Sequence, residues 1–152
     1  MVPAQLSIGV NTEDFDPLAA LGHWQRELAT RLAAAPAAES SFVGRVRHTT
    51  AESQPLEALE LEHYPGMTER QLEQLARAAA QRHRALAVLV RHRVGRVTPG
   101  AAIVLVAVAA DRRGPAQRCC KELLEALKHD APFWKREWRA DGSGTWLSGN
   151  TP

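Results

Sequence analysis

Short segments of alternating or uninterrupted apolar residues lie along this chain, separated by longer segments with apolar residues three or four positions apart. The short segments predict β-strands, and the longer ones predict amphipathic helices. The expected strands are residues 5–10, 41–47, 56–63, 85–93, 101–109, 133–138 and 145–147. The expected helices are residues 17–34, residues 68–84, and a segment that follows Pro115 and ends near residue 129. Because strands and helices alternate along the chain, we expect an α/β or α+β fold around one mixed sheet.

Local signals mark where several of these elements begin. Pro17 suits the first position of a helix, and the polar residues 11–14 supply turn and capping groups before it. Thr68 and Gln71 fit the capping-box pattern at the start of the second helix. Residues 101–109 form the most apolar strand, which we expect at the centre of the sheet with both faces covered.

The length of 152 residues suits a single domain. Within it we expect an N-terminal strand and helix in residues 1–40, a mobile loop in residues 49–55 and a C-terminal tail in residues 147–152. No apolar run approaches the roughly 20 residues of a membrane span, and no signal peptide is visible. The adjacent Cys119 and Cys120 suit neither a disulfide framework nor a metal site, so we expect a cytoplasmic location.

Positive charge is concentrated in the second half of the chain. Residues 1–80 contain six basic and eleven acidic side chains, whereas residues 81–152 contain thirteen basic and six acidic ones. Sixteen of the nineteen basic residues are arginines, and the three lysines are Lys121, Lys128 and Lys135. A positive half attracts an anion, and a lysine, unlike an arginine, can lose its proton and act as a base or a nucleophile.

Two of these lysines are expected to converge on one pocket. Lys128 lies one helical turn after Leu124, at the border of the apolar stripe, where its aliphatic stem can be buried. Lys135 follows on the next strand, after a change of chain direction. We expect Arg112 and Arg113, at the start of the same helix as Lys128, to hold a phosphate and to lower the pKa of a nearby lysine.

Other chemistry has less support in the sequence. The six histidines show no metal-ligand spacing, and the chain has no hydrolase elbow, P-loop or dinucleotide-binding glycine motif. A structural alternative is that Lys121 and Lys128 only form surface ion pairs with Glu125, and we favour this alternative for Lys121.

Five blocks of the sequence resemble the large, catalytic subunit of molybdopterin synthase. They occur in that family's order and at closely matching spacing, and the similarity extends over about residues 41–146. The blocks are residues 42–47, 61–69, 91–95, 99–100 and 131–137. The resemblance implies an α/β hammerhead fold, with three helices on a mixed sheet and a small inserted antiparallel β subdomain.

The family's activity follows as an expectation from the same resemblance. It implies a sulfurtransferase that moves two sulfurs from the C-terminal Gly-Gly thiocarboxylate of a small ubiquitin-like carrier subunit to cyclic pyranopterin monophosphate. The product is the dithiolene of molybdopterin, in molybdenum cofactor biosynthesis, and the step needs no cofactor and no metal. The resemblance also implies a homodimer that binds two carriers and forms a heterotetramer, with no nucleic-acid or membrane partner.

Four residues take site roles from the resemblance. The family's two active-site lysines correspond to Lys128 and Lys135, which would transfer protons or stabilise the thiocarboxylate, and one of them would capture the carrier's glycine as an amide. Arg47 corresponds to an arginine near the substrate pocket, and Phe42 to an aromatic residue of the pocket wall. The structural alternatives for these last two are a solvated cation at a strand end and an ordinary core aromatic.

The chain departs from the family pattern in two places. Arg112 and Arg113 stand where the family usually has His-Arg, so an imidazole is replaced by a permanent cation that binds anions but transfers no proton. The tail, residues 148–152, has no charged side chain, whereas the family often has a basic one there. We expect Arg112 and Arg113 to hold more of the substrate phosphate in compensation.

Two other functions stay open at this point. One is a scaffold that binds the carrier without catalysis, because of the change to Arg112. The other is a nucleic-acid-binding module that uses the positive half and the C-terminal tryptophans. Against it, Trp134 and Trp138 fall on one face of a strand, as packing residues do, and no RNA-binding motif accompanies them.

Overall fold

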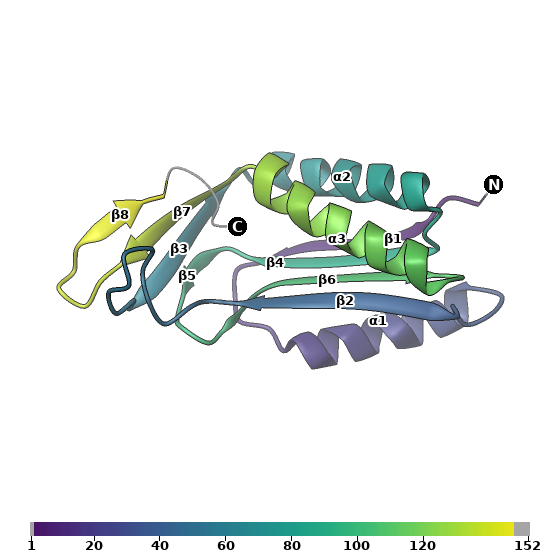
Figure 1. The fold of residues 1–152 in the computed structure, drawn as a ribbon, viewed down its shortest axis with the longest axis horizontal. Coiled ribbons are helices and arrows are strands. Elements are labelled where there is room, and N and C mark those ends of the chain that lie inside the picture. Colours follow the sequence, from purple (N-terminus) through teal and green to yellow (C-terminus); the bar gives the residue numbers. More distant parts are fainter. Residues whose placement is uncertain (1, 148–152) are drawn as a thin grey trace.

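The computed structural model describes residues 2–147, and within this range it has three helices and eight strands (Figure 1). In chain order these are β1 (Gln5–Asn11), α1 (Pro17–Arg31), β2 (Ala38–Arg45), β3 (Ala58–His63), α2 (Met67–His83), β4 (Ala87–Arg93), β5 (Gly95–Val97), β6 (Ala102–Ala110), α3 (Arg113–Asp130), β7 (Phe133–Trp138) and β8 (Gly144–Trp146). No helix in the described part of the chain is long and apolar enough to cross a membrane.

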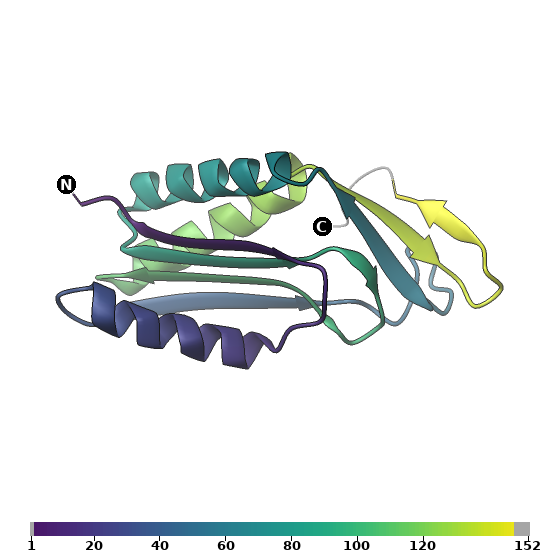
Figure 2. The ribbon, with the colours of Figure 1, turned by 180° about the vertical axis from the view of Figure 1, so that it is seen from behind.

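The larger sheet has the strand order β1-β4-β6-β2 and is covered by helices on both faces. β1 pairs with β4 in parallel, whereas β4 with β6 and β6 with β2 are antiparallel. Helices α2 and α3 lie on one face and α1 lies on the other, as the two opposite views show (Figures 1 and 2). This sheet is the mixed sheet that the sequence predicts.

The most apolar strand occupies the predicted central position. Side chains of β6 alternate between the two covered faces, so Leu105 packs with Trp24 of α1, whereas Val106 packs with Leu123 of α3. All four of these side chains are almost completely buried. Burial of each aliphatic side chain contributes about 1.5–3 kcal/mol, so this double layer is the main stabilising region.

A second, antiparallel sheet has the order β5-β3-β7-β8. The prediction of a single sheet is therefore wrong. The alternation of apolar residues indicates which face of a strand is buried, but it does not indicate with which strand it pairs. β4 ends at Arg93, and Gly95, with a φ of +86°, turns the chain into β5, which pairs with β3 in the new sheet. The two sheets together match the expected mixed sheet with three helices and a small antiparallel subdomain.

Several element boundaries differ from the prediction. Helix α1 ends at Arg31 instead of residue 34, and its N-cap is Asp16, whose carboxylate accepts hydrogen bonds from two backbone amides. The second expected strand is Ala38–Arg45 instead of residues 41–47. It starts earlier because β2 pairs with β6 along its whole length, from Ala38 opposite Ala110.

The predicted capping box at Thr68 is also wrong. Gly66 is the N-cap of α2, and its amide donates to Glu69 Oε2 at 2.7 Å. Thr68 lies inside the helix, where its buried hydroxyl accepts from the Tyr64 amide and donates to the Pro132 carbonyl oxygen. The helix begins early because Gly66 adopts a φ of +84°, which other residues rarely adopt.

The two tryptophans of β7 do share one strand face, but that face is open. Trp134 is 43% exposed and makes an edge-to-face contact with Tyr64, at 4.9 Å between ring centroids. Trp138 lies against the guanidinium of Arg136, which also stacks on Trp146 at 3.9 Å. The expectation that these tryptophans are ordinary packing residues is therefore wrong for Trp134.

Candidate functional site

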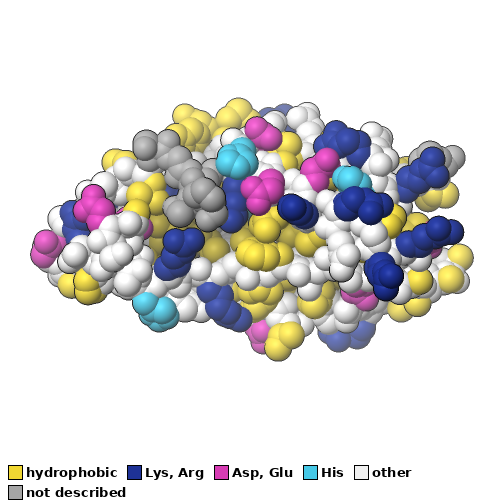
Figure 3. All heavy atoms as spheres, viewed as in Figure 1, with side chains coloured by type: hydrophobic (Ala, Val, Ile, Leu, Met, Phe, Trp, Pro, Cys, Tyr) yellow, Lys and Arg dark blue, Asp and Glu magenta, His cyan; other side chains and the backbone are white. Residues whose placement is uncertain are grey.

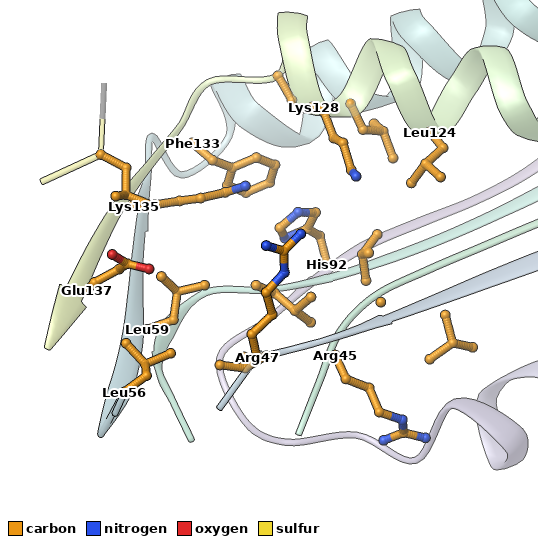
Figure 4. A pocket seen from close by; sticks show the side chains of 18 of the residues that line it. Arg45, Arg47, Leu56, Leu59, His92, Leu124, Lys128, Phe133, Lys135 and Glu137 are labelled. Carbon is orange, nitrogen blue, oxygen red and sulfur yellow. The ribbon is translucent and has the colours of Figure 1, made fainter. Parts of the chain in front are cut away.

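A cavity of about 400 Å³ opens where the two sheets meet. Its walls come from the end of β2 and the segment after it, the last turns of α3, the inner face of β7 and the end of β4 (Figure 4). Apolar side chains such as Leu59, Leu124 and Leu127 form much of the lining. The charged side chains that line it come from elements far apart in the sequence, so the fold itself assembles the site.

Lys128 reaches this cavity from the last turn of α3. Leu123 and Leu127 are buried on the core side of the helix, and Leu124 and Lys128 lie beside them at the edge of the cavity. The predicted position of Lys128, at the border of the apolar stripe, is confirmed. Lys121 is exposed and does not line the cavity, so it takes no part in this site, and its ion pair with Glu125 stays a prediction.

Lys135 enters the same cavity from β7. Alternation along the strand directs Phe133, Lys135 and Glu137 inward, whereas Trp134 lies on the opposite face. Burial lowers the pKa of the Lys135 amine, and the charge of Lys128 lowers it further. The predicted convergence of the two lysines is therefore confirmed, and Figure 4 shows both side chains extending into the cavity.

Arg47 and Phe42 also line the cavity, on the side of β2. Arg47 follows the strand, and Figure 4 shows its guanidinium directed toward the two lysines. The Phe42 ring is 37% exposed, and it lies close to Gly44, where a Cβ atom would come within 3.2 Å of Phe42 and 2.9 Å of Val104. Glycine at position 44 therefore leaves room for the ring at the cavity wall.

Arg112 and Arg113 do not join this cavity. Both are exposed at the first turn of α3, whereas Lys128 is in its last turn. Fifteen residues of helix at about 1.5 Å each separate Arg113 from Lys128 by about 22 Å. The prediction that these arginines lower the pKa of a nearby lysine is therefore wrong within one chain, because the helix holds the two ends apart.

Two lining residues escaped the sequence reasoning. His92 is buried at the end of β4, and its ring stacks on Phe133 with 4.0 Å between centroids. Burial lowers the pKa of His92 to about 4, and the charges of Lys135 and His63 act in the same direction. The available signal was its register, because His92 continues the row of Val88 and Val90 on the buried face of the strand.

Glu137 is the second lining residue that the sequence did not indicate, and it connects the cavity to residues 49–55. Its two carboxylate oxygens accept from the Ala51 amide at 3.1 and 3.2 Å. Within the segment, Thr49 bridges to Pro55, and the Thr50 hydroxyl accepts from the Glu52 and Gln54 amides. The segment thus has its own hydrogen bonds, and its mobility stays a prediction.

The chemistry of the cavity is that of an anion site with proton-transfer groups. The lining contains four cationic residues, one carboxylate and one buried imidazole, which are Arg45, Arg47, Lys128, Lys135, Glu137 and His92. Arg45 turns away from the two lysines, as Figure 4 shows, and its guanidinium donates to the Gly100 carbonyl oxygen. Figure 3 shows Lys and Arg side chains around apolar ones on the face that carries α3. Among residues 2–147 no group of three or more His, Cys, Asp or Glu side chains is placed to hold a metal ion. The uncharged tail, residues 148–152, lies outside the described residues.

Comparison with known proteins gives consistent similarities. The family model described as MoaE protein matches residues 13–130. A molybdopterin synthase catalytic subunit of Ralstonia nicotianae is 43% identical over 139 residues, which cover 90% of this chain and 74% of the relative. A solved structure of a molybdopterin biosynthesis MoaE protein from Burkholderia ambifaria has a TM-score of 0.74 and 38% identity, covering 97% of this chain and 91% of that one.

A more distant structure shares the fold. It is a complex of subunits 1 and 2 of the molybdopterin-converting factor from Helicobacter pylori, with a TM-score of 0.72 and 20% identity, covering 95% of this chain and 90% of that chain. At this identity the similarity concerns the arrangement of helices and strands alone.

Proposed function

Because this chain belongs to the MoaE protein family, to which molybdopterin synthase catalytic subunits belong, we propose that the cavity between its two sheets is the sulfur-transfer site. The reaction moves two sulfurs from the thiocarboxylated C-terminus of a small carrier subunit to cyclic pyranopterin monophosphate and forms the molybdopterin dithiolene. The observation that carries the proposal is the meeting of Lys128 and Lys135, from a helix and a strand, in one cavity.

The two lysines have complementary tasks in this proposal. The thiocarboxylate of the carrier and the phosphate of the substrate are anions, so the ammonium groups of Lys128 and Lys135 hold both near the reacting atoms. The lowered pKa of Lys135 brings its amine closer to neutral pH, where it can give or accept a proton. An arginine at either position would bind the anions but transfer no proton.

Arg47 and Phe42 bind substrate in this proposal. A guanidinium matches a phosphate with two parallel hydrogen bonds, and Arg47 points into the cavity opposite the lysines. Phe42 supplies an apolar surface at the cavity wall, against which a flat ring system can pack.

Arg112 and Arg113 enter the proposal only through a second copy of the chain. Their distance from Lys128 excludes a shared site within one chain, so in a homodimer they would reach the cavity of the partner. Mixing Lys135→Ala chains with Arg113→Glu chains tests this, because mixed dimers then regain one intact site. Activity above that of either variant alone supports the shared site, and activity no greater than the average of the two contradicts it.

The proposed assembly is a heterotetramer of two such chains and two carriers. The carrier's C-terminal Gly-Gly needs a narrow entry to the cavity, and glycines suit close approach to the wall around Gly44. We place the assembly in the cytoplasm, because Cys119 and Cys120 are free, buried thiols of the kind that a reducing compartment preserves.

An anaerobic single-turnover assay tests the function. It uses the full chain, a thiocarboxylated Gly-Gly carrier and cyclic pyranopterin monophosphate, and compares Lys135→Ala with the matched control Lys121→Ala. We expect dithiolene product from the native chain and the control, and a loss of about 10²–10⁴-fold for Lys135→Ala. A native chain that binds the carrier but yields no product would contradict the proposal and indicate a scaffold.

A further inference from the structure

His92 is a polar residue in a row of apolar ones. Val88, Val90 and His92 lie on the same face of β4, the face that packs against α2 and α3. The two valines are completely buried in the core, and His92, at 7% exposure, is the residue at which this row reaches the cavity. A buried imidazole is costly unless its nitrogen atoms find partners, so its presence here needs a reason.

The backbone determines which nitrogen faces the cavity. His92 Nδ1 lies 2.9 Å from the carbonyl oxygen of Arg93, which can only accept a hydrogen bond. Nδ1 therefore carries the proton, and in the neutral ring Nε2 has a lone pair. Because Nδ1 is engaged by the backbone, Nε2 is the nitrogen that remains for the cavity, among the cationic side chains in Figure 4.

The same ring is linked to Lys135 by packing. His92 stacks on Phe133 at an interplanar angle of 16°, and Phe133 is two residues before Lys135 on the inner face of β7. The stack joins the end of the larger sheet to the first residue of β7. A displaced Phe133 would therefore displace Lys135 as well.

We propose that His92 is a positioning residue for Lys135, holding β7 through Phe133 and offering the Lys135 ammonium an acceptor at Nε2. This inference rests on the proposed role of Lys135 in sulfur transfer. The charged and titratable groups around the pair come from several elements. They are Glu137 on β7, Lys128 on α3, Arg45 at the end of β2, Arg47 after it and His63 on β3.

A neutral ring suits this place better than a charged one. Lys128 and Arg47 already bring positive charge into the cavity beside Lys135, so a protonated imidazole would add repulsion. A lone pair at Nε2 instead stabilises the ammonium form of Lys135 and limits the fall of its pKa that burial causes. The inference therefore predicts that loss of the lone pair lowers the Lys135 pKa further.

Competitive acetylation measures this effect directly. The folded full chain reacts with trace acetic anhydride across a pH series, and peptide mass spectrometry follows each lysine separately, because the chain has only three. His92→Phe keeps a ring to stack on Phe133 but has no lone pair. We expect its Lys135 labelling midpoint about one pH unit below that of the native chain, while the Lys121 midpoint stays the same.

Two further variants keep the test specific. Val88→Ala opens a cavity in the same strand face away from the site, and its Lys135 midpoint should match the native value. His92→Gln restores an acceptor and should return part of the shift. An unchanged Lys135 midpoint in His92→Phe, or an equal shift in Val88→Ala, would overturn the inference. The assay needs neither carrier nor pterin, so its result is independent of whether the proposed reaction occurs.

Discussion

The two sheets of this protein are built from similar strands but differ in what covers them. In the larger sheet, helices cover both faces, and β6 is buried along almost its whole length. In the smaller sheet, the inner face of β7 lines the cavity, and its outer face exposes Trp134. The charged side chains of the candidate site lie where the smaller sheet meets the larger one.

The difference teaches how the molecule separates stability from chemistry. Burial of Leu and Val side chains on both faces of the larger sheet supplies a rigid support. Lys135 and His92 are placed at its margin, where burial shifts their pKa values but the cavity still admits ligands. Polar groups inside the double layer would only be costly.

The largest expected effect on stability separates the two sheets. Leu105→Ala removes a completely buried side chain between α1 and the larger sheet, so it should lower the free energy of unfolding by about 2–5 kcal/mol. Leu59→Ala makes the same change in β3, where the side chain is only partly buried beside the cavity, and should cost about 1 kcal/mol. Denaturant titration measures both, and equal costs would remove the distinction.

The next effect concerns acid stability at the margin between the sheets. The His92 pKa is lowered to about 4 in the folded protein, against 6.5 for an ordinary histidine. Between these pH values the unfolded chain binds more protons, so the free energy of unfolding falls as the pH falls, by up to about 3 kcal/mol.

His92→Phe is the matched variant for this prediction, because it lacks the titrating ring. Denaturant titrations at pH 7 and pH 4 should show a smaller loss for His92→Phe than for the native chain. If both proteins lose the same free energy of unfolding, His92 is not the group that titrates.

The smallest expected effect is at the edge of the cavity. Glu137→Gln weakens a charge-assisted hydrogen bond to the Ala51 amide, at an expected cost of about 1 kcal/mol or less. Hydrogen exchange of the Ala51 amide should become faster by several-fold, whereas amides of β6 should exchange as in the native chain. Exchange that rises equally in β6 would show that Glu137 supports the whole fold.

The sequence predicts much of this arrangement but not all of it. Hydrophobic spacing locates the helices and strands to within a few residues, and it brings Lys128 and Lys135 to one place, because both positions depend on local periodicity. Hydrophobic spacing does not predict the division into two sheets, because the pairing of strands depends on contacts between residues distant in sequence. The capping group of α2 also escapes prediction from the sequence, because the N-cap is Gly66, a residue without a capping side chain.

The site residues show the same limit. Helix spacing correctly describes neighbours on one helix face, but it cannot place Arg112 near Lys128, because they lie at opposite ends of α3. His92 escaped notice because a histidine in an apolar strand has no motif, and only the structure shows that its row ends in the cavity.

The central claim is that Lys128 and Lys135 act together in one site. A double-mutant cycle tests it most directly, with single-turnover rates of sulfur transfer for Lys128→Ala, Lys135→Ala and the double variant. Residues that act as a unit are strongly non-additive, so the double variant should be slower than the worse single variant by no more than about threefold. If the rate losses of the two single variants multiply in the double variant, the lysines act independently, and the claim that they act together is contradicted.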